Sequence, residues 1–162
     1  MEKAKAIVVF IWSTLMSLLG ILAIPVILLV SCNVIDYFTA IPAAKYRGQV
    51  VASKTGVRGI TKKVCMWLLV VVGAIVDVLL KYASDTIGLV LPFKFLIACV
   101  VAIWLVCNEI ISILENISDI GVALPPFLQP IIKNLKSQVE SKATVEASSL
   151  VVSAESEEKK SE

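Results

Sequence analysis

The sequence contains no histidine and has few charged residues. Of its 162 residues, 17% are charged and 58% are hydrophobic, and the mean hydropathy is +0.91. Soluble domains average about 25% charged and about 45–50% apolar residues, so this composition excludes a soluble globular domain and favours a membrane protein. The absence of histidine excludes Ser-His and Cys-His catalytic pairs and most zinc sites. We therefore expect neither an enzyme nor a bound cofactor or metal.

The few cysteines and the small net charge exclude further classes of protein. The four cysteines all lie inside apolar runs without CxxC spacing, which is typical of small buried hydrophobic residues and not of a disulfide or metal framework. The net charge is +2, and the basic residues are concentrated in one segment between apolar runs. This distribution is typical of the loops of membrane proteins, and we expect no nucleic-acid partner.

Three apolar runs are long enough to cross a bilayer. No charge occurs in residues 6–35, a stretch that would be about 45 Å long as one helix, against a hydrocarbon core of about 30 Å. Gly20 and Pro25 are the points where it would break, which predicts a short N-terminal helix over about 6–20 and a spanning helix over about 22–43. Two further spans are predicted within residues 64–83 and 87–114.

These runs define an all-helical membrane protein with four regions. We expect an N-terminal membrane helix in residues 1–21, a three-span region in 22–116, a proline-containing segment with an amphipathic helix in 117–142, and a disordered charged tail in 143–162. The amphipathic helix is typical either of a helix on an anionic membrane surface or of an ordinary solvated helix.

Residues 45–63 are basic without interruption by an acid and are predicted to form a cytoplasmic loop. The basic residues are Lys45, Arg47, Lys54, Arg58, Lys62 and Lys63. Short basic loops remain in the cytoplasm, so the chain is expected to be a multi-pass protein with its C-terminus inside the cell.

Polar residues within the spans are costly to insert and are the candidate functional residues. They are Asn33, Asp36, Asp77, Lys81, Asn108, Glu109, Ser112 and Glu115. The four-residue spacing of Asp77 and Lys81 predicts an ion pair within one helix. The set has two interpretations: side chains that meet other copies or line water in an oligomer, or hydrogen bonds within one three-helix bundle.

Four segments in order carry a resemblance to a known family. They are NVIDYFTA at 33–40, SKTGVRGITKK at 53–63, Asp77 in the second span, and NEIISILEN at 108–116 followed by GVALP at 121–125. Together they resemble the toxin secretion/phage lysis holins over about residues 33–130.

The resemblance implies a phage protein that accumulates in the host cytoplasmic membrane and then assembles with itself into timed lesions. Its partners would be membrane lipids, other copies of the chain and an endolysin that crosses without direct contact, and some relatives would release large toxins. A small homo-oligomeric ion channel or transporter subunit is the alternative function. A passive membrane anchor is a third interpretation, which the insertion cost of the buried acids disfavours.

Overall fold

The structure, a computed structural model, describes residues 2–49, 53–88 and 95–161, and every element in them is helical. The elements are α1 (Glu2–Leu19), a 3₁₀ turn η1 (Gly20–Leu22), α2 (Ala23–Tyr46), α3 (Ser53–Ile87), α4 (Leu96–Asp119) and α5 (Leu128–Ser161). Three segments, Gly20–Tyr46, Gly59–Ile87 and Leu96–Asp119, are long and apolar enough to cross a membrane. The predicted all-helical fold with three membrane-crossing helices is confirmed.

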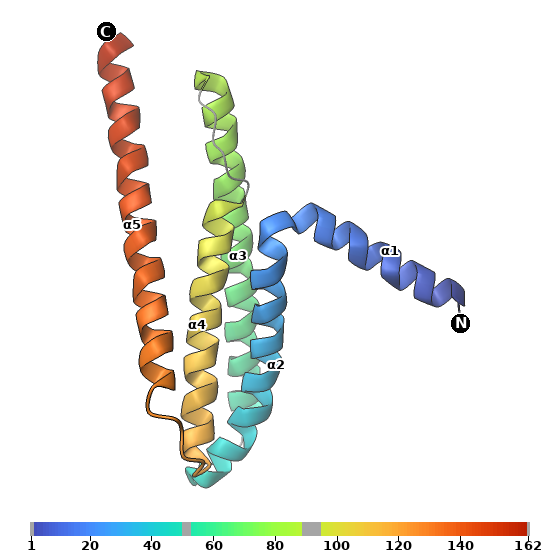
Figure 1. Cartoon of the computed structure of the whole chain (residues 1–162). Coiled ribbons are helices and arrows are strands. Elements are labelled where there is room, and N and C mark those ends of the chain that lie inside the picture. Colours follow the sequence, from blue (N-terminus) through green and yellow to red (C-terminus); the bar gives the residue numbers. More distant parts are fainter. Residues whose placement is uncertain (1, 50–52, 89–94, 162) are drawn as a thin grey trace.

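The N-terminal apolar run breaks at Gly20, one of the two positions expected from the sequence. Gly20 has a φ of +52°, a backbone conformation that residues with a side chain rarely adopt. From this point α1 runs away from the other helices at a wide angle (Figure 1). Pro25 does not break the helix, because it lies in the first turn of α2, where its missing N–H is not needed.

Helices α2, α3 and α4 lie side by side in a bundle with one apolar core (Figure 1). The buried core residues are Leu22, Leu29, Cys32, Met66, Val70, Ala98, Ala102, Leu105, Val106 and Ile113. Helices α3 and α4 approach each other closely at Gly73, where an added Cβ atom would lie 2.9 Å from the Cα of Ala98. Small residues allow two helix backbones to approach in this way, as in membrane helix pairs.

The outer surface of the bundle is apolar. Large hydrophobic side chains on α2 and α3 point outward, including Leu28, Val34, Leu68, Val72 and Leu79, each at least 49% exposed. An exposed apolar surface of this extent is typical of a protein whose surroundings are lipid chains and not water.

The sequence predicted that the whole basic segment 45–63 forms a loop. The structure shows that this prediction is wrong for part of the segment. Helix α2 continues to Tyr46 and α3 begins at Ser53, so residues 53–63 form the first three turns of α3. Residues 50–52 and the side chains of Lys54 and Arg58 lie outside the described part. Lysine and arginine have high helix propensity, and packing of the following apolar run extends the helix backward into this segment.

The C-terminal tail is also helical, in contrast to the disorder expected for 143–162. Helix α5 runs to Ser161 and lies along α4, antiparallel to it (Figure 1). The indole N–H of Trp104 donates to Glu140 Oε1 at 2.6 Å, and the Lys136 amine lies 4.9 Å from the centre of the Trp104 ring. Alanine, glutamate and lysine, which are frequent in this tail, favour helix over disorder.

Candidate functional site

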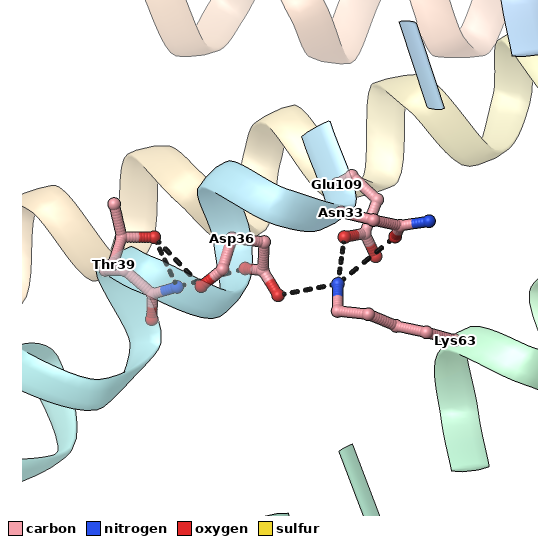
Figure 2. A network of polar contacts seen from close by, with 6 residues as sticks. Asn33, Asp36, Thr39, Lys63 and Glu109 are labelled. Atoms are coloured by element: carbon pink, nitrogen blue, oxygen red, sulfur yellow. Dashed lines mark hydrogen bonds and ion pairs between the residues drawn. The ribbon is translucent and has the colours of Figure 1, made fainter. Parts of the chain in front are cut away.

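A cluster of charged and amide side chains lies between the three helices of the bundle, with Lys63 of α3 at its centre. The Lys63 amine donates to Glu109 Oε2 of α4 at 2.5 Å, to Asp36 Oδ2 of α2 at 3.0 Å and to Asn33 Oδ1 at 3.2 Å (Figure 2). One ammonium group therefore joins all three helices. We call Asn33, Asp36, Lys63, Glu109 and Asn116 the polar cluster.

Asn116, about two helical turns after Glu109 on α4, extends the polar cluster. Its Nδ2 donates to Asp36 Oδ1 at 3.0 Å and to the Thr39 hydroxyl at 3.3 Å. The Thr39 hydroxyl in turn donates to the backbone carbonyl of Asp36 at 3.1 Å. Both oxygens of the Asp36 carboxylate are thereby bonded, one to an ammonium group and one to an amide.

The polar cluster is shielded from the surroundings of the bundle. The side chains of Glu109, Asp36 and Lys63 are 4%, 14% and 19% exposed. Asp36 lies ten residues before the end of α2 at Tyr46, about 15 Å along the helix and so well within a bilayer-spanning segment. Unpaired charges at that depth would be costly, and here each carboxylate meets the same ammonium.

The sequence interpretation did not place Lys63 in this cluster, because Lys63 was assigned to the basic loop. The sequence does contain a pattern that places Lys63 on the inward face of its helix. Lys63, Met66, Val70, Gly73 and Asp77 follow one another at spacings of three and four residues, which places all five on one face of a helix. In the structure this face points into the bundle, and Lys63 is its first residue.

Asp77 is bonded to α4 and not to Lys81, so the predicted Asp77–Lys81 pair is wrong. Its two carboxylate oxygens accept from the backbone N–H groups of Ile97 and Ala98 at 2.9 and 2.8 Å. These groups lie in the first turn of α4, where N–H groups have no partner within the helix, and an acid complements the helix dipole. Lys81 pairs instead with Asp85 on the exposed surface, at 2.9 Å.

The remaining candidate residues are not part of the polar cluster. Asn108 and Ser112 are half-buried on α4, and Glu115 is exposed. In the described part of the chain the side chains of these three residues form no hydrogen bond or ion pair. Of the basic residues, Arg47 pairs with Asp119 and so ties the end of α2 to the end of α4. Lys45 and Lys62 are exposed.

A pocket of about 340 Å³ opens between α2 and α3 beside the polar cluster, and we call it the α2–α3 pocket. It is lined by Val30, Asn33, Val34, Tyr37, Phe38, Lys63 and Trp67. Asn33 is 8% exposed, and its Nδ2 has no hydrogen-bond partner. The orientation of this amide is fixed, because the Lys63 ammonium can only donate and must face the amide oxygen.

The polar cluster suits the joining of helices better than catalysis or metal binding. Lys63 already occupies the carboxylate oxygens that face it, and the described residues contain no group of three side chains able to hold a metal ion.

Comparison with known proteins identifies the family. The family model described as the bacteriophage holin family matches residues 13–137. The chain belongs to the bacteriophage holin family. The match includes the whole three-helix bundle, the polar cluster and the beginning of α5.

Relatives of this chain come from several bacteria and are described as uncharacterised proteins. An uncharacterised protein from Halalkalibacterium halodurans is 36% identical over 67% of this chain and 76% of its own length. An uncharacterised protein from Clostridium perfringens is 28% identical over 81% of this chain and 89% of its own. An uncharacterised protein from Listeria monocytogenes is 33% identical over 64% of this chain and 66% of its own length. No solved structure matches this holin.

Proposed function

We propose that this holin accumulates in the cytoplasmic membrane of the host as separate, non-leaking chains and then assembles into lesions at a set time. The lesions release an endolysin, or a large toxin, from the cytoplasm. Membership in the holin family supports this role, and the protein acts without an enzymatic step of its own.

The observation that carries the proposal is that each deep charge has an opposite charge beside it within one chain, with one ammonium shared by two carboxylates. Lys63 bonds to Asp36 and Glu109 inside the bundle, while lipid-compatible side chains cover the outside. Each of these charges therefore has an ion-pair contact without water or a second chain, which favours a single chain that stays in lipid without conducting ions. A lesion then requires assembly through other surfaces.

The charge distribution supports an orientation for the bundle. Lys45 and Arg47 lie at the end of α2, and the sequence of the first turns of α3 contains Lys54 and Arg58, so this end faces the cytoplasm by the positive-inside rule. The connection between α4 and α5 is then cytoplasmic, and α1 leaves the bundle at the outer surface (Figure 1). Figure 1 draws the end of α5 toward that outer side, so a cytoplasmic C-terminus requires that α5 leaves α4.

Helix α5 cannot keep its place along α4 when α4 is surrounded by hydrocarbon. It carries Lys133, Lys136, Glu140 and Lys142, and each charge at bilayer depth costs about 2.5–3.5 kcal/mol. In this proposal α5 leaves α4 when the bundle inserts. It then lies on the anionic inner surface, where its lysines are favourable.

The test is expression of the full chain in a bacterium beside a cytoplasmic cell-wall hydrolase that lacks an export signal. We expect sudden lysis that needs both proteins and that an uncoupler brings forward, with hydrolase activity appearing outside the membrane. The controls are each protein alone and an inactive hydrolase. Growth arrest with ion leakage but no hydrolase crossing would contradict the proposal and support a fixed ion pore.

A further inference from the structure

The α2–α3 pocket is an apolar groove that opens to the outside of the bundle. Helices α2 and α3 both pack on α4, and the groove lies between them. On α2 it is lined by a row at four-residue spacing, Val30, Val34 and Phe38, which are 44%, 50% and 67% exposed. On α3 it is lined by Trp67, which packs partly against the core. The described part of the chain leaves the row on α2 largely uncovered.

The length of this row suits one acyl chain of a lipid. Val30 and Phe38 are about 12 Å apart along the helix, as their positions in α2 require. The acyl chains of one leaflet extend over about 15 Å, which is half of a hydrocarbon core of about 30 Å. The rings of Tyr37 and Phe38 stand edge to face, with their centroids 6.0 Å apart, at the cytoplasmic end of the row. Aromatic side chains are frequent where acyl chains meet headgroups.

Lys45 gives the cytoplasmic mouth of the groove a positive charge. Phe38, Ile41 and Lys45 follow one another at spacings of three and four residues, so Lys45 lies on the groove side of α2, about 10 Å beyond Phe38. Lys45 is exposed, and among the described residues its amine has no ion-pair partner. Lys63 also lines the groove, but its amine already bonds to two carboxylates of the polar cluster. Lys45, and not Lys63, is therefore the cation available to a ligand in the groove.

Lipid headgroups lie within reach of the groove. Lys62 is exposed on α3, and its neighbour Lys63 bonds to Asn33, so Lys62 lies at the level of the groove. An exposed lysine of a membrane protein extends its stem along apolar surface and keeps its amine in the headgroup zone. A lipid of the cytoplasmic leaflet can therefore place its headgroup at the mouth and a chain in the groove. That leaflet is anionic, which complements the charge of Lys45.

We propose that an anionic phospholipid of the cytoplasmic leaflet occupies the α2–α3 pocket, with one acyl chain along the row on α2 and its phosphate beside Lys45. This inference rests on the insertion and orientation given in the proposed function, and it names the partner of the bundle before assembly. An uncharged phospholipid would fill the row equally well but would gain no attraction at Lys45. The charge of the headgroup therefore decides which lipid the pocket prefers.

The experiment measures how brominated phospholipids quench the fluorescence of Trp67 in vesicles that contain the full chain. Trp12→Phe and Trp104→Phe leave Trp67 as the single tryptophan. Brominated phosphatidylglycerol, which is anionic, and brominated phosphatidylcholine, which is uncharged overall, are compared at equal mole fractions. We expect the anionic lipid to bind beside Trp67 about fivefold more strongly, the factor that corresponds to about 1 kcal/mol for one lysine.

Matched variants test the positions of the phosphate and of the acyl chain. Lys45→Gln should remove most of the preference for the anionic lipid. Lys62→Gln should keep it, because Lys62 is also exposed and basic but does not line the groove. Trp67→Phe combined with Leu68→Trp moves the tryptophan by one residue to the outer surface of α3, where Leu68 is 57% exposed and lies outside the groove. The two lipids should quench the moved tryptophan equally.

Three results would overturn the inference. Equal quenching of Trp67 by the two lipids would indicate ordinary surrounding lipid. A preference that survives Lys45→Gln, or that Lys62→Gln abolishes equally, would indicate attraction to the basic end as a whole. Protection of Trp67 from both lipids that disappears when the protein is diluted in lipid would indicate a second copy in the pocket. Quenching requires no lysis, so these results leave the proposed function standing, and a failure of hydrolase release leaves a measured lipid preference standing.

Discussion

Replacing Lys63 by methionine tests whether the polar cluster holds the bundle together. The substitution keeps a long apolar stem and leaves Asp36 and Glu109 without their shared ammonium. At an effective dielectric constant of about 20, two charges 3.0 Å apart attract by about 5–6 kcal/mol, part of which the cost of burying them offsets. Breaking a buried pair costs about 3–5 kcal/mol, and we expect Lys63→Met to lower the free energy of unfolding by that amount.

The measurement is unfolding in mixed micelles at neutral pH, followed by circular dichroism. Lys62→Met is the matched control, because Lys62 is the preceding residue of the same helix, is equally basic and is exposed. It should change the free energy of unfolding by less than about 1 kcal/mol. Adding Asp36→Asn and Glu109→Gln to Lys63→Met removes the unpaired charges, and this triple variant should recover much of the lost stability.

Equal stability of the Lys63→Met and Lys62→Met variants would refute the reasoning, since it would mean that the buried ion triad contributes nothing. A triple variant no more stable than Lys63→Met would also contradict it, because the loss would then come from packing and not from uncompensated charge.

Two other predictions concern the contact between α3 and α4 and use the same unfolding assay. Gly73→Ala should destabilise the bundle by about 1–3 kcal/mol, because the new Cβ meets the backbone of Ala98, whereas Gly59→Ala, in open space, should stabilise α3 by about 0.5–1 kcal/mol. Equal changes in the free energy of unfolding for the two glycine variants would show that the close approach of α3 and α4 at Gly73 does not affect stability. Asp77→Ala should lower the free energy of unfolding by about 1–2 kcal/mol, because two N–H groups of α4 lose their acceptor. Asp85→Ala, the control on the exposed surface, should lower it by less than about 1 kcal/mol. Equal losses of stability would contradict the role of Asp77 as a cap of α4.

Some members of the polar cluster could be found from the sequence. Asn33, Asp36 and Glu109 are polar residues in otherwise apolar runs, and insertion cost alone marks them as residues with a role inside the protein. Thr39, which bonds to the polar cluster through Asn116, could not be found in this way, because threonine is common in membrane helices and the bond depends on where α4 lies.

Lys63 and Asp77 show why the rest could not be predicted. Composition marks Lys63 as one more charge of a basic segment. Only the packing of α2 and α3 on α4 brings its amine to two acids. Helical spacing offers Asp77 a partner at Lys81, but the start of α4 presents two N–H groups to the same carboxylate. Spacing along one helix shows which neighbours a side chain could bond to on that helix. It does not show whether a group on another helix is the preferred partner.

The sequence by itself determined that the chain is helical, that three segments can cross a bilayer and that the N-terminal run breaks near Gly20. These outcomes follow from the length of apolar runs and from backbone freedom, both of which are local. Only the tertiary structure decided which charge meets which, that residues 53–63 join α3, and that the amide nitrogen of Asn33 is buried without a hydrogen-bond partner. These outcomes depend on distances between helices. The spacing of residues along a single helix contains no information about those distances.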